Sequence, residues 1–275
     1  MTAAVERHYA RSRLGQLHYV RGEPASGAPT APPLILLHQN PSSTFEYKWL
    51  IELMAADRTV IAFDTPGYGM SDAPPGPLRA EDYAAVFSDG IDQLDLGEGN
   101  VDVYGFHTGT VFACELALAR PDRIGRLVLT GVPYRTPPER AERLANIHAV
   151  PAPEEAGDGI FERLRWLWDF TVKGRHPGVS VERAADIFID RARTLNRYWW
   201  PYDAVWRWPV EDRLPLIHQP VLILQPDEML RDQSVNAASL LRNGSIQELP
   251  DLNRDVFEPG GGVATLASAM RAFLS

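Results

Sequence analysis

The sequence of 275 residues contains one cysteine, Cys114, so a disulfide bond within the chain is excluded. Cys114 stands in an apolar stretch and is expected to be a small buried side chain. No apolar run approaches the roughly 20 residues of a membrane-spanning helix, so no membrane partner is expected. Residues 1–15 contain no long apolar segment either, which predicts a chain without a signal peptide and a cytoplasmic location.

Basic residues form no run, and the formal net charge is −9. An acidic surface argues against nucleic acid and anionic membranes as partners. Closely spaced metal-ligand motifs are also lacking, so no metal is expected. A zinc site made by His38, His107 and Asp227 is the weak alternative, because imidazole and carboxylate both bind zinc. A small molecule is therefore the expected partner, and the chain is expected to be a monomer or a homodimer.

Short apolar runs do occur, and they alternate with segments of helical spacing. This alternation predicts an α/β fold in which a parallel sheet carries helices on both faces. The expected strands are a pair over 6–21 that turns at Leu14-Gly15, followed by 34–38, 58–64, 101–104, 126–130, 220–224 and 244–249. The expected helices cover 44–56, 80–96, 109–120, 231–242 and 260–273.

Residues 134–212 interrupt this alternation. They are rich in arginine, glutamate, proline and aromatic residues, and six of the seven tryptophans lie there. We expect a helical insertion over 134–212, and a sheet domain made of 1–133 and 213–275.

Five motifs resemble, in order, those of the α/β-hydrolase fold, which implies that fold with the insertion as a helical cap. They are the oxyanion-hole strand and loop, the following turn, the nucleophile elbow with its helix, the strand before the catalytic acid, and the segment of the catalytic histidine. In this sequence they read LILLHQNPSSTFEYKWL, RTVIAFDTPGYGMSD, VDVYGFHTGTVFACELALARPDRIGRLVLTG, RLPLIHQPVLILQPDE and SIQELPDLNRDVFEP. The stretch HQNPSS is similar to the HGNPTSS loop of haloalkane dehalogenases, and Asn40 matches the asparagine that holds the halide there. The resemblance is to the branch that contains these enzymes and epoxide hydrolases.

The catalytic triad of the family is altered in this chain. The family places a serine, aspartate or cysteine at the elbow, where this sequence has His107. Arg254 stands where the family has its histidine base, and an arginine cannot act as a base at neutral pH. The acid position is Met229 on a strict alignment, although Asp227 and Glu228 stand beside it.

His107 has three interpretations. It can act as a general base, because imidazole titrates near neutral pH and the helix dipole at the elbow favours its neutral form. It can act as a nucleophile that forms an acyl-imidazole, or it can be a polar residue left in a binding pocket. As a base it would be supported by oxyanion donors from the N–H group of Thr108 and from that of Asn40 or Gln39. The side chain of Thr108 is expected to point away from the substrate.

Two further residues have competing interpretations. Arg254 can clamp a substrate carboxylate, or it can pair with Asp227 or Glu228. His38 is expected to bond the loop backbone or to contact substrate. The expected catalytic residues are His107, Thr108, Asn40, Arg254 and Asp227. The expected substrate-binding residues are His38, Gln39, His148, Trp166, Trp199, Trp200 and Tyr202.

Two tryptophan pairs in the insertion have i, i+2 spacing, namely Trp166 with Trp168 and Trp206 with Trp208. On a helix this spacing puts the two rings of a pair on different faces, so both members of a pair cannot line one pocket. The insertion nevertheless supplies enough aromatic side chains for an apolar pocket.

The leading functional hypothesis is a hydrolase or carbon–carbon lyase, without a cofactor, that acts on a small apolar or aromatic carbonyl compound with His107 as base. The first alternative is a catalytically degenerate ligand-binding protein, suggested by the loss of the usual nucleophile and base. Dehalogenation is a third hypothesis that rests on Asn40, although the aspartate nucleophile is missing.

Overall fold

The computed structural model describes residues 3–147 and 158–275. Eight strands form one sheet in the order β1-β2-β4-β3-β5-β6-β7-β8. β1 pairs antiparallel with β2 and β2 antiparallel with β4, whereas all other neighbours are parallel. The strands are β1 (Ala4–Ser12), β2 (Gly15–Glu23), β3 (Leu34–Leu37), β4 (Val60–Phe63), β5 (Val101–Phe106), β6 (Ile124–Thr130), β7 (Val221–Pro226) and β8 (Gly244–Leu249).

Helices connect the parallel strands, as the alternation of the sequence predicts. The core helices are α1 (Lys48–Met54), α2 (Ala80–Ile91), α3 (Thr108–Ala119), α9 (Arg231–Ala238) and α10 (Val263–Leu274). The insertion contributes α4 (Pro137–Ala145), α5 (Asp158–Trp168), the π-helix η2 (Asp169–Lys173), α6 (Val181–Ala192), α7 (Trp200–Arg207) and α8 (Val210–Arg213). Short 3-10 turns are η1 (Thr44–Tyr47), η3 (Leu195–Arg197), η4 (Leu214–Leu216) and η5 (Pro259–Gly261).

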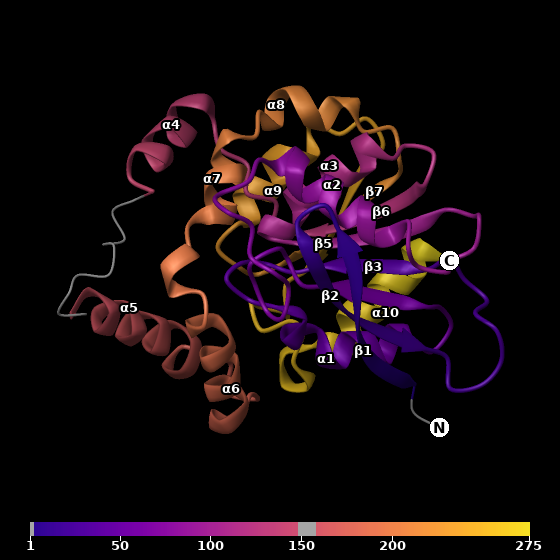
Figure 1. Ribbon diagram of the computed structural model, residues 1–275, viewed down its shortest axis with the longest axis horizontal. Coiled ribbons are helices and arrows are strands. Elements are labelled where there is room, and N and C mark those ends of the chain that lie inside the picture. The colour runs from indigo at the N-terminus through magenta and orange to yellow at the C-terminus, as the bar shows by residue number, and fades with distance from the viewer. Residues whose placement is uncertain (1–2, 148–157) are drawn as a thin grey trace.

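The sheet has an apolar layer on each face, because successive strand residues point to opposite sides. In β3, Ile35 and Leu37 belong to the cluster under α2 and α3, whereas Leu34 and Leu36 belong to the cluster under α1 and α10. Figure 1 shows these two helix layers above and below the sheet. The expected α/β-hydrolase architecture is therefore confirmed.

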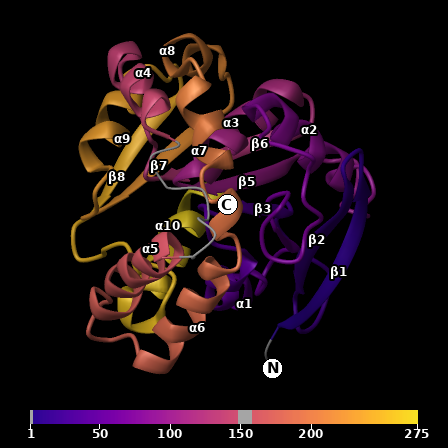
Figure 2. The same ribbon diagram turned by 60° about the vertical axis from the view of Figure 1, so that its left-hand side comes forward.

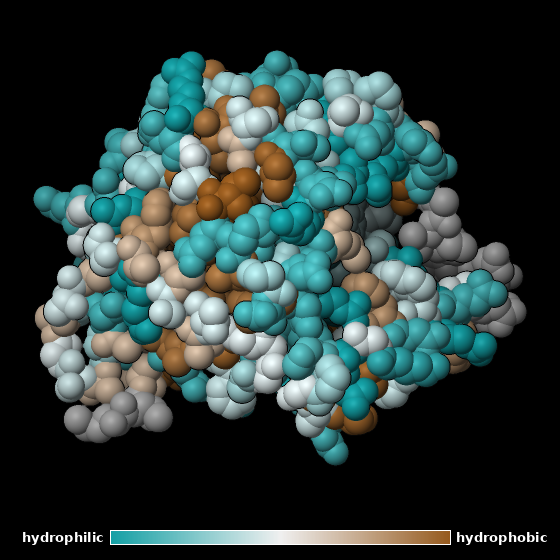
Figure 3. All heavy atoms as spheres, turned by 180° about the vertical axis from the view of Figure 1, so that it is seen from behind, coloured by the Kyte–Doolittle hydropathy of each residue, from teal (hydrophilic) through white to brown (hydrophobic). Residues whose placement is uncertain are grey.

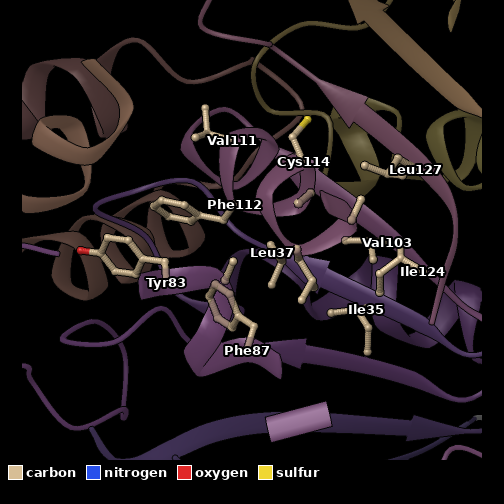
Figure 4. Packing of buried hydrophobic residues seen from close by; sticks show 14 of the residues in the cluster. Ile35, Leu37, Tyr83, Phe87, Val103, Val111, Phe112, Cys114, Ile124 and Leu127 are labelled. Atoms are coloured by element: carbon tan, nitrogen blue, oxygen red, sulfur yellow. The ribbon is translucent and has the colours of Figure 1, made fainter. Parts of the chain in front are cut away.

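Aromatic rings fill the larger of these two clusters. Tyr83 and Phe87 of α2 meet Phe112 of α3, with ring centroids 4.4 and 6.3 Å apart, respectively (Figure 4). Cys114 lies in the same cluster, 1% exposed, as expected for a small hydrophobic side chain. These buried side chains pack α3 against its neighbours (Figure 4), and His107 at the elbow is the N-cap of α3.

The insertion divides into two parts. α5, η2 and α6 stand away from the sheet in Figures 1 and 2. In contrast, Val205 of α7, Trp208 and Val210 of α8 are buried in the core cluster that packs on the sheet. The chain therefore packs on the core again before residue 212, the expected end of the insertion.

The surface is mostly hydrophilic. The face in Figure 3 shows charged and polar residues around a central group of hydrophobic ones. Among residues 3–147 and 158–275, no helix combines the length and the apolar character needed to cross a bilayer.

Candidate active site

The turn from β5 into α3 has the geometry of a nucleophile elbow, with His107 at its tip. His107 has φ +48° and ψ −113°, and it is the only described non-glycine residue with positive φ. Glycines are needed on both sides. A β-carbon at Gly105 would lie 2.6 Å from the carbonyl oxygen of Gly109, and one at Gly109 would lie 2.1 Å from that of Leu37. Such backbone strain is typical of functional positions.

The imidazole of His107 lies against an acidic side chain from the loop that follows β7. Its Nε2 is 3.2 Å from Oε2 of Glu228, and the Glu228 side chain is 1% exposed. The two groups lie at ion-pair distance, but their relative orientation does not meet hydrogen-bond geometry. Gly131 makes room for this contact, since a β-carbon there would lie 2.2 Å from Cδ2 of His107 and 2.6 Å from Nε2.

The second ring nitrogen of His107, Nδ1, is the less enclosed of the two. Nε2 is shut off from solvent, whereas the side chain as a whole remains 17% exposed and lines the main cavity. No described residue forms a hydrogen bond with Nδ1, which is not among the buried unpaired atoms. Nδ1 is thus the nitrogen that an incoming molecule can reach.

Thr108 and Asn40 form a closed hydrogen-bonded pair beside the elbow. The backbone N–H of Asn40 donates to Oγ1 of Thr108 (2.9 Å), and that hydroxyl donates to Oδ1 of Asn40 (2.8 Å). The pair fixes the side-chain amide, whose Nδ2 is buried and has no partner. Asn40 lines the cavity, so this amide supplies a donor without an acceptor.

The expected oxyanion donors need a correction. The backbone N–H of Asn40 is occupied by Thr108, and that of Gln39 donates to Oε1 of Glu46 (3.2 Å). The Gln39 side chain lines the cavity, but its Nε2 also donates to Glu46 (2.9 Å). The N–H of Thr108 is at the first residue of α3, where amides have no partner within their own helix. The donors that remain are therefore the N–H of Thr108 and Nδ2 of Asn40.

The main cavity, of about 570 Å³, lies between the carboxyl ends of the parallel strands and the outer part of the insertion. Trp166 and Phe170 stack there with ring centroids 5.3 Å apart. Tyr202 also lines it and donates to the carbonyl oxygen of Asn40 (2.6 Å). Burial raises the pKa of the Tyr202 phenol well above its ordinary value, so the hydroxyl remains a donor.

Arg254 lines the same cavity but forms no ion pair with Asp227 or Glu228. Its Nη2 donates to the carbonyl oxygens of Phe170 (2.6 Å) and Gly174. Its guanidinium lies over the ring of Phe170, 4.2 Å from the centroid. The position that holds the base in relatives therefore connects the core to the insertion here.

Two expected assignments do not agree with the structure. Asp227 lines the cavity but is exposed, and its neighbour Glu228, whose side chain is buried, contacts His107 instead. His38 is fully buried and contacts backbone only, because Nδ1 donates to the Gln39 carbonyl (2.6 Å) and Nε2 accepts from the N–H of Thr65 (2.9 Å). His38 therefore orients the loop and does not reach the cavity.

The aromatic residues of the insertion are distributed differently from the expectation. Trp166 lines the main cavity, but Trp199 lines a separate hollow beside Trp206, and Trp200 lies edge-on to Trp199. His148 lies outside the described residues. The main cavity is also lined by Tyr198 and by four residues that no pattern in the sequence indicates, namely Phe170, Arg175, Arg191 and Asn253.

No group of three or more histidine, cysteine, aspartate or glutamate side chains among the described residues could hold a metal ion. The three residues of the weak zinc hypothesis do not converge, since both nitrogens of His38 are bonded to backbone and Asp227 is exposed.

Comparison with known proteins identifies the class. The sequence pattern of the α/β hydrolase fold matches residues 32–176, more than half of the chain. The protein belongs to this family. Over 134 residues it is 31% identical to a haloalkane dehalogenase of Mycolicibacterium paratuberculosis, a match that covers 45% of this chain and 42% of the dehalogenase. The chain thus aligns with less than half of that relative's length.

Other similar proteins extend the match over the whole fold. A poly(3-hydroxyalkanoate) depolymerase of Ectopseudomonas oleovorans is 27% identical over 219 residues, which cover 74% of this chain and 70% of the depolymerase. The crystal structure of an enol-lactonase from Burkholderia xenovorans LB400 superposes with a TM-score of 0.75 over 97% of this chain and 99% of the lactonase, at 18% identity. At that identity the superposition shows the shared fold alone.

Proposed function

We propose that the protein is a cofactor-free hydrolase or carbon–carbon lyase that acts on a small apolar or aromatic carbonyl compound, with His107 as general base. One observation carries the proposal. His107 occupies the strained tip of the elbow, with Nε2 3.2 Å from the buried Glu228 and Nδ1 accessible from the cavity. The names of similar proteins, among them a dehalogenase and a depolymerase, support hydrolytic chemistry in general.

Glu228 determines which nitrogen of His107 acts. A carboxylate beside Nε2 favours the tautomer that carries its proton there. The lone pair then lies on Nδ1, the less enclosed nitrogen. In an ordinary triad the carboxylate contacts Nδ1 and the base is Nε2, so the two nitrogens have exchanged roles.

Ester hydrolysis follows directly from this arrangement. Nδ1 of His107 takes a proton from water, and the water oxygen forms a bond to the carbonyl carbon. The N–H of Thr108 and Nδ2 of Asn40 donate to the resulting oxyanion. Glu228 stabilises the imidazolium, which then returns its proton to the leaving alkoxide as the carbon–oxygen bond breaks.

The same groups can support carbon–carbon cleavage. With a β-hydroxy-ketone, Nδ1 of His107 removes the hydroxyl proton, the carbon–carbon bond breaks, and the electron pair forms an enolate. The donors of Thr108 and Asn40 stabilise the enolate oxygen, and the imidazolium returns the proton to carbon.

The test is a His107→Ala variant assayed against aryl esters, β-keto acids and β-hydroxy-ketones, with products identified by mass spectrometry. The wild type should turn over at least one class, and the variant should lose about 10²–10⁴-fold of that rate. His218→Ala, a change at an exposed histidine, should leave the rate unchanged. A wild type without activity, or a His107→Ala variant of equal activity, would refute the proposal. An acyl adduct on His107 in quenched samples would indicate the nucleophilic route instead.

A ligand-binding role without catalysis is the second candidate, favoured by Arg254. The residue at the base position is bonded to the carbonyl oxygens of Phe170 and Gly174 and has no catalytic partner. This role predicts saturable quenching of tryptophan fluorescence by an aromatic ligand that is recovered unchanged. Conversion of the bound ligand would exclude it.

Dehalogenation receives support from the relatives and from the unpaired donor of Asn40. It requires a carboxylate nucleophile at the elbow, where this chain has an imidazole. Incubation with haloalkanes should therefore release no halide above the rate of the His107→Ala variant.

A further inference from the structure

Arginine side chains line one part of the main cavity without an acidic partner. Nη2 of Arg254 donates to the carbonyl oxygens of Phe170 and Gly174, and the stack on Phe170 fixes the plane of the guanidinium. No acidic oxygen of the described residues lies within 4 Å of its nitrogens. Nε and Nη1 are not enclosed by protein, so two nitrogens of this fixed cation can still donate a hydrogen bond.

Arg175 repeats this arrangement on the other side of the same turn. Its Nε donates to the carbonyl oxygen of Val179 (2.9 Å) and its Nη1 to that of Val172 (2.8 Å). It likewise has no acidic oxygen within 4 Å among the described residues. Both guanidiniums thus contact the carboxyl end of η2, and both line the cavity.

Two of the three acidic residues that line the cavity are engaged elsewhere. Glu228 contacts His107, and Asp255 accepts the backbone N–H of His176 (2.6 Å). The third, Asp227, forms no ion pair with a described residue. Burial lowers the pKa of Arg254, which Asp255 partly opposes and Arg191 reinforces. A half-buried cation of this kind is stabilised by an anion that accepts from its remaining N–H groups.

We propose that Arg254 and Arg175 bind a carboxylate of the substrate, and that the stacked rings of Trp166 and Phe170 contact its apolar body. The substrate class is then a small aromatic or aliphatic acid that carries the reacting carbonyl as a separate group. Each guanidinium keeps N–H groups that can donate a charge-assisted hydrogen bond to a carboxylate oxygen, and the two rings offer an apolar wall beside it. This inference rests on the proposed function for the identity of the reacting group.

The test measures binding in the His107→Ala variant, so that turnover does not interfere. Phenylacetate and 3-phenylpropionate are compared with their neutral amides by titration calorimetry. The carboxylates should bind at least about tenfold more tightly than the amides, and the preference should weaken as salt is raised. Arg254→Gln and Arg175→Gln should each reduce it, Arg254→Lys should retain part of it, and Arg165→Gln, a change at an exposed arginine of α5, should leave it unchanged.

Two results would overturn the inference. Equal affinity for acids and amides in the parent would show that no anion is recognised. An equal loss of both ligands in Arg254→Gln and Arg254→Lys, with a lowered melting temperature, would show that Arg254 only holds η2 in place. The proposed function can fail separately. If the wild type is inactive but still prefers carboxylates, the catalytic proposal is refuted and the carboxylate site stands.

Discussion

Nε2 of His107 lies 3.2 Å from Oε2 of Glu228, although 120 residues separate the two in the chain. The contact joins the elbow after β5 to the loop after β7. In the proposed mechanism His107 is the base and Glu228 is the acid that supports it. Glu228 would then be a positioning residue that acts through the imidazole.

Replacement of Glu228 by glutamine should lower turnover by about 10²-fold, because the imidazolium loses its counter-charge and Nε2 its preferred protonation. Asp232→Asn is the control, since Asp232 is an exposed carboxylate of α9 that does not line the cavity. Steady-state rates over pH should retain their wild-type profile in Asp232→Asn and change shape in Glu228→Gln. Equal rates in the two variants would exclude Glu228 from the mechanism.

The fold was predictable from the sequence because its signals are local. Buried parallel strands have continuous apolar runs, and the Gly-x-His-x-Gly pattern has a steric cause at Gly105 and Gly109. The i, i+2 argument for the tryptophans is also confirmed. Trp166 lines the cavity, whereas Trp168 packs against Phe188 with ring centroids 5.2 Å apart.

The features of the site that the sequence did not predict depend on contacts between distant segments. Whether Asp227 or Glu228 points inward depends on how the chain turns after β7 ends at Pro226, which no local pattern reports. The backbone N–H of Asn40 donates to the hydroxyl of Thr108, 68 residues away. The position of Trp199 depends on how the insertion folds back, so the aromatic composition alone could not assign it to the cavity.

Gly131→Ala should displace the imidazole of His107. The new β-carbon would lie 2.2 Å from Cδ2 and within 3.2 Å of Oε1 of Glu228, and φ is +70°. Positive φ alone destabilises alanine by about 1–2 kcal/mol. Gly27→Ala is the control for that strain, because Gly27 has φ +81° and open space around it. Urea unfolding should show similar losses for both variants, and activity should fall in Gly131→Ala only. Full activity in Gly131→Ala would contradict the placement of the ring.

Asp190 of α6 should make stability depend on pH. Burial raises the pKa of this carboxyl, Asp64 and Glu46 raise it further, and the hydrogen bond from Ser43 (2.8 Å) opposes them. The folded protein therefore holds the proton more tightly than the unfolded chain. The free energy of unfolding contributed by Asp190 is full below about pH 3.9, the unfolded pKa, and decreases as pH rises through the higher folded pKa.

Asp190→Asn removes this loss and still offers an acceptor to Ser43. Its unfolding free energy, measured by urea titration from pH 4 to pH 8, should decline less with pH than that of the wild type. Asp186→Asn, at an exposed carboxylate of the same helix, should follow the wild-type curve. A steeper decline in Asp190→Asn would have the wrong sign and would mean that the ionised carboxylate stabilises the fold.

The hydroxyl of Thr108 should contribute more to the free energy of unfolding than its methyl group. Thr108→Val keeps the shape but leaves the N–H and Oδ1 of Asn40 buried without partners, which costs about 1–3 kcal/mol. Thr108→Ser keeps both hydrogen bonds and loses a methyl group, so its cost should be smaller. Urea unfolding of the two variants measures the difference. If serine destabilised the protein as much as valine, packing and not the Asn40 hydrogen bonds would hold this loop against the elbow.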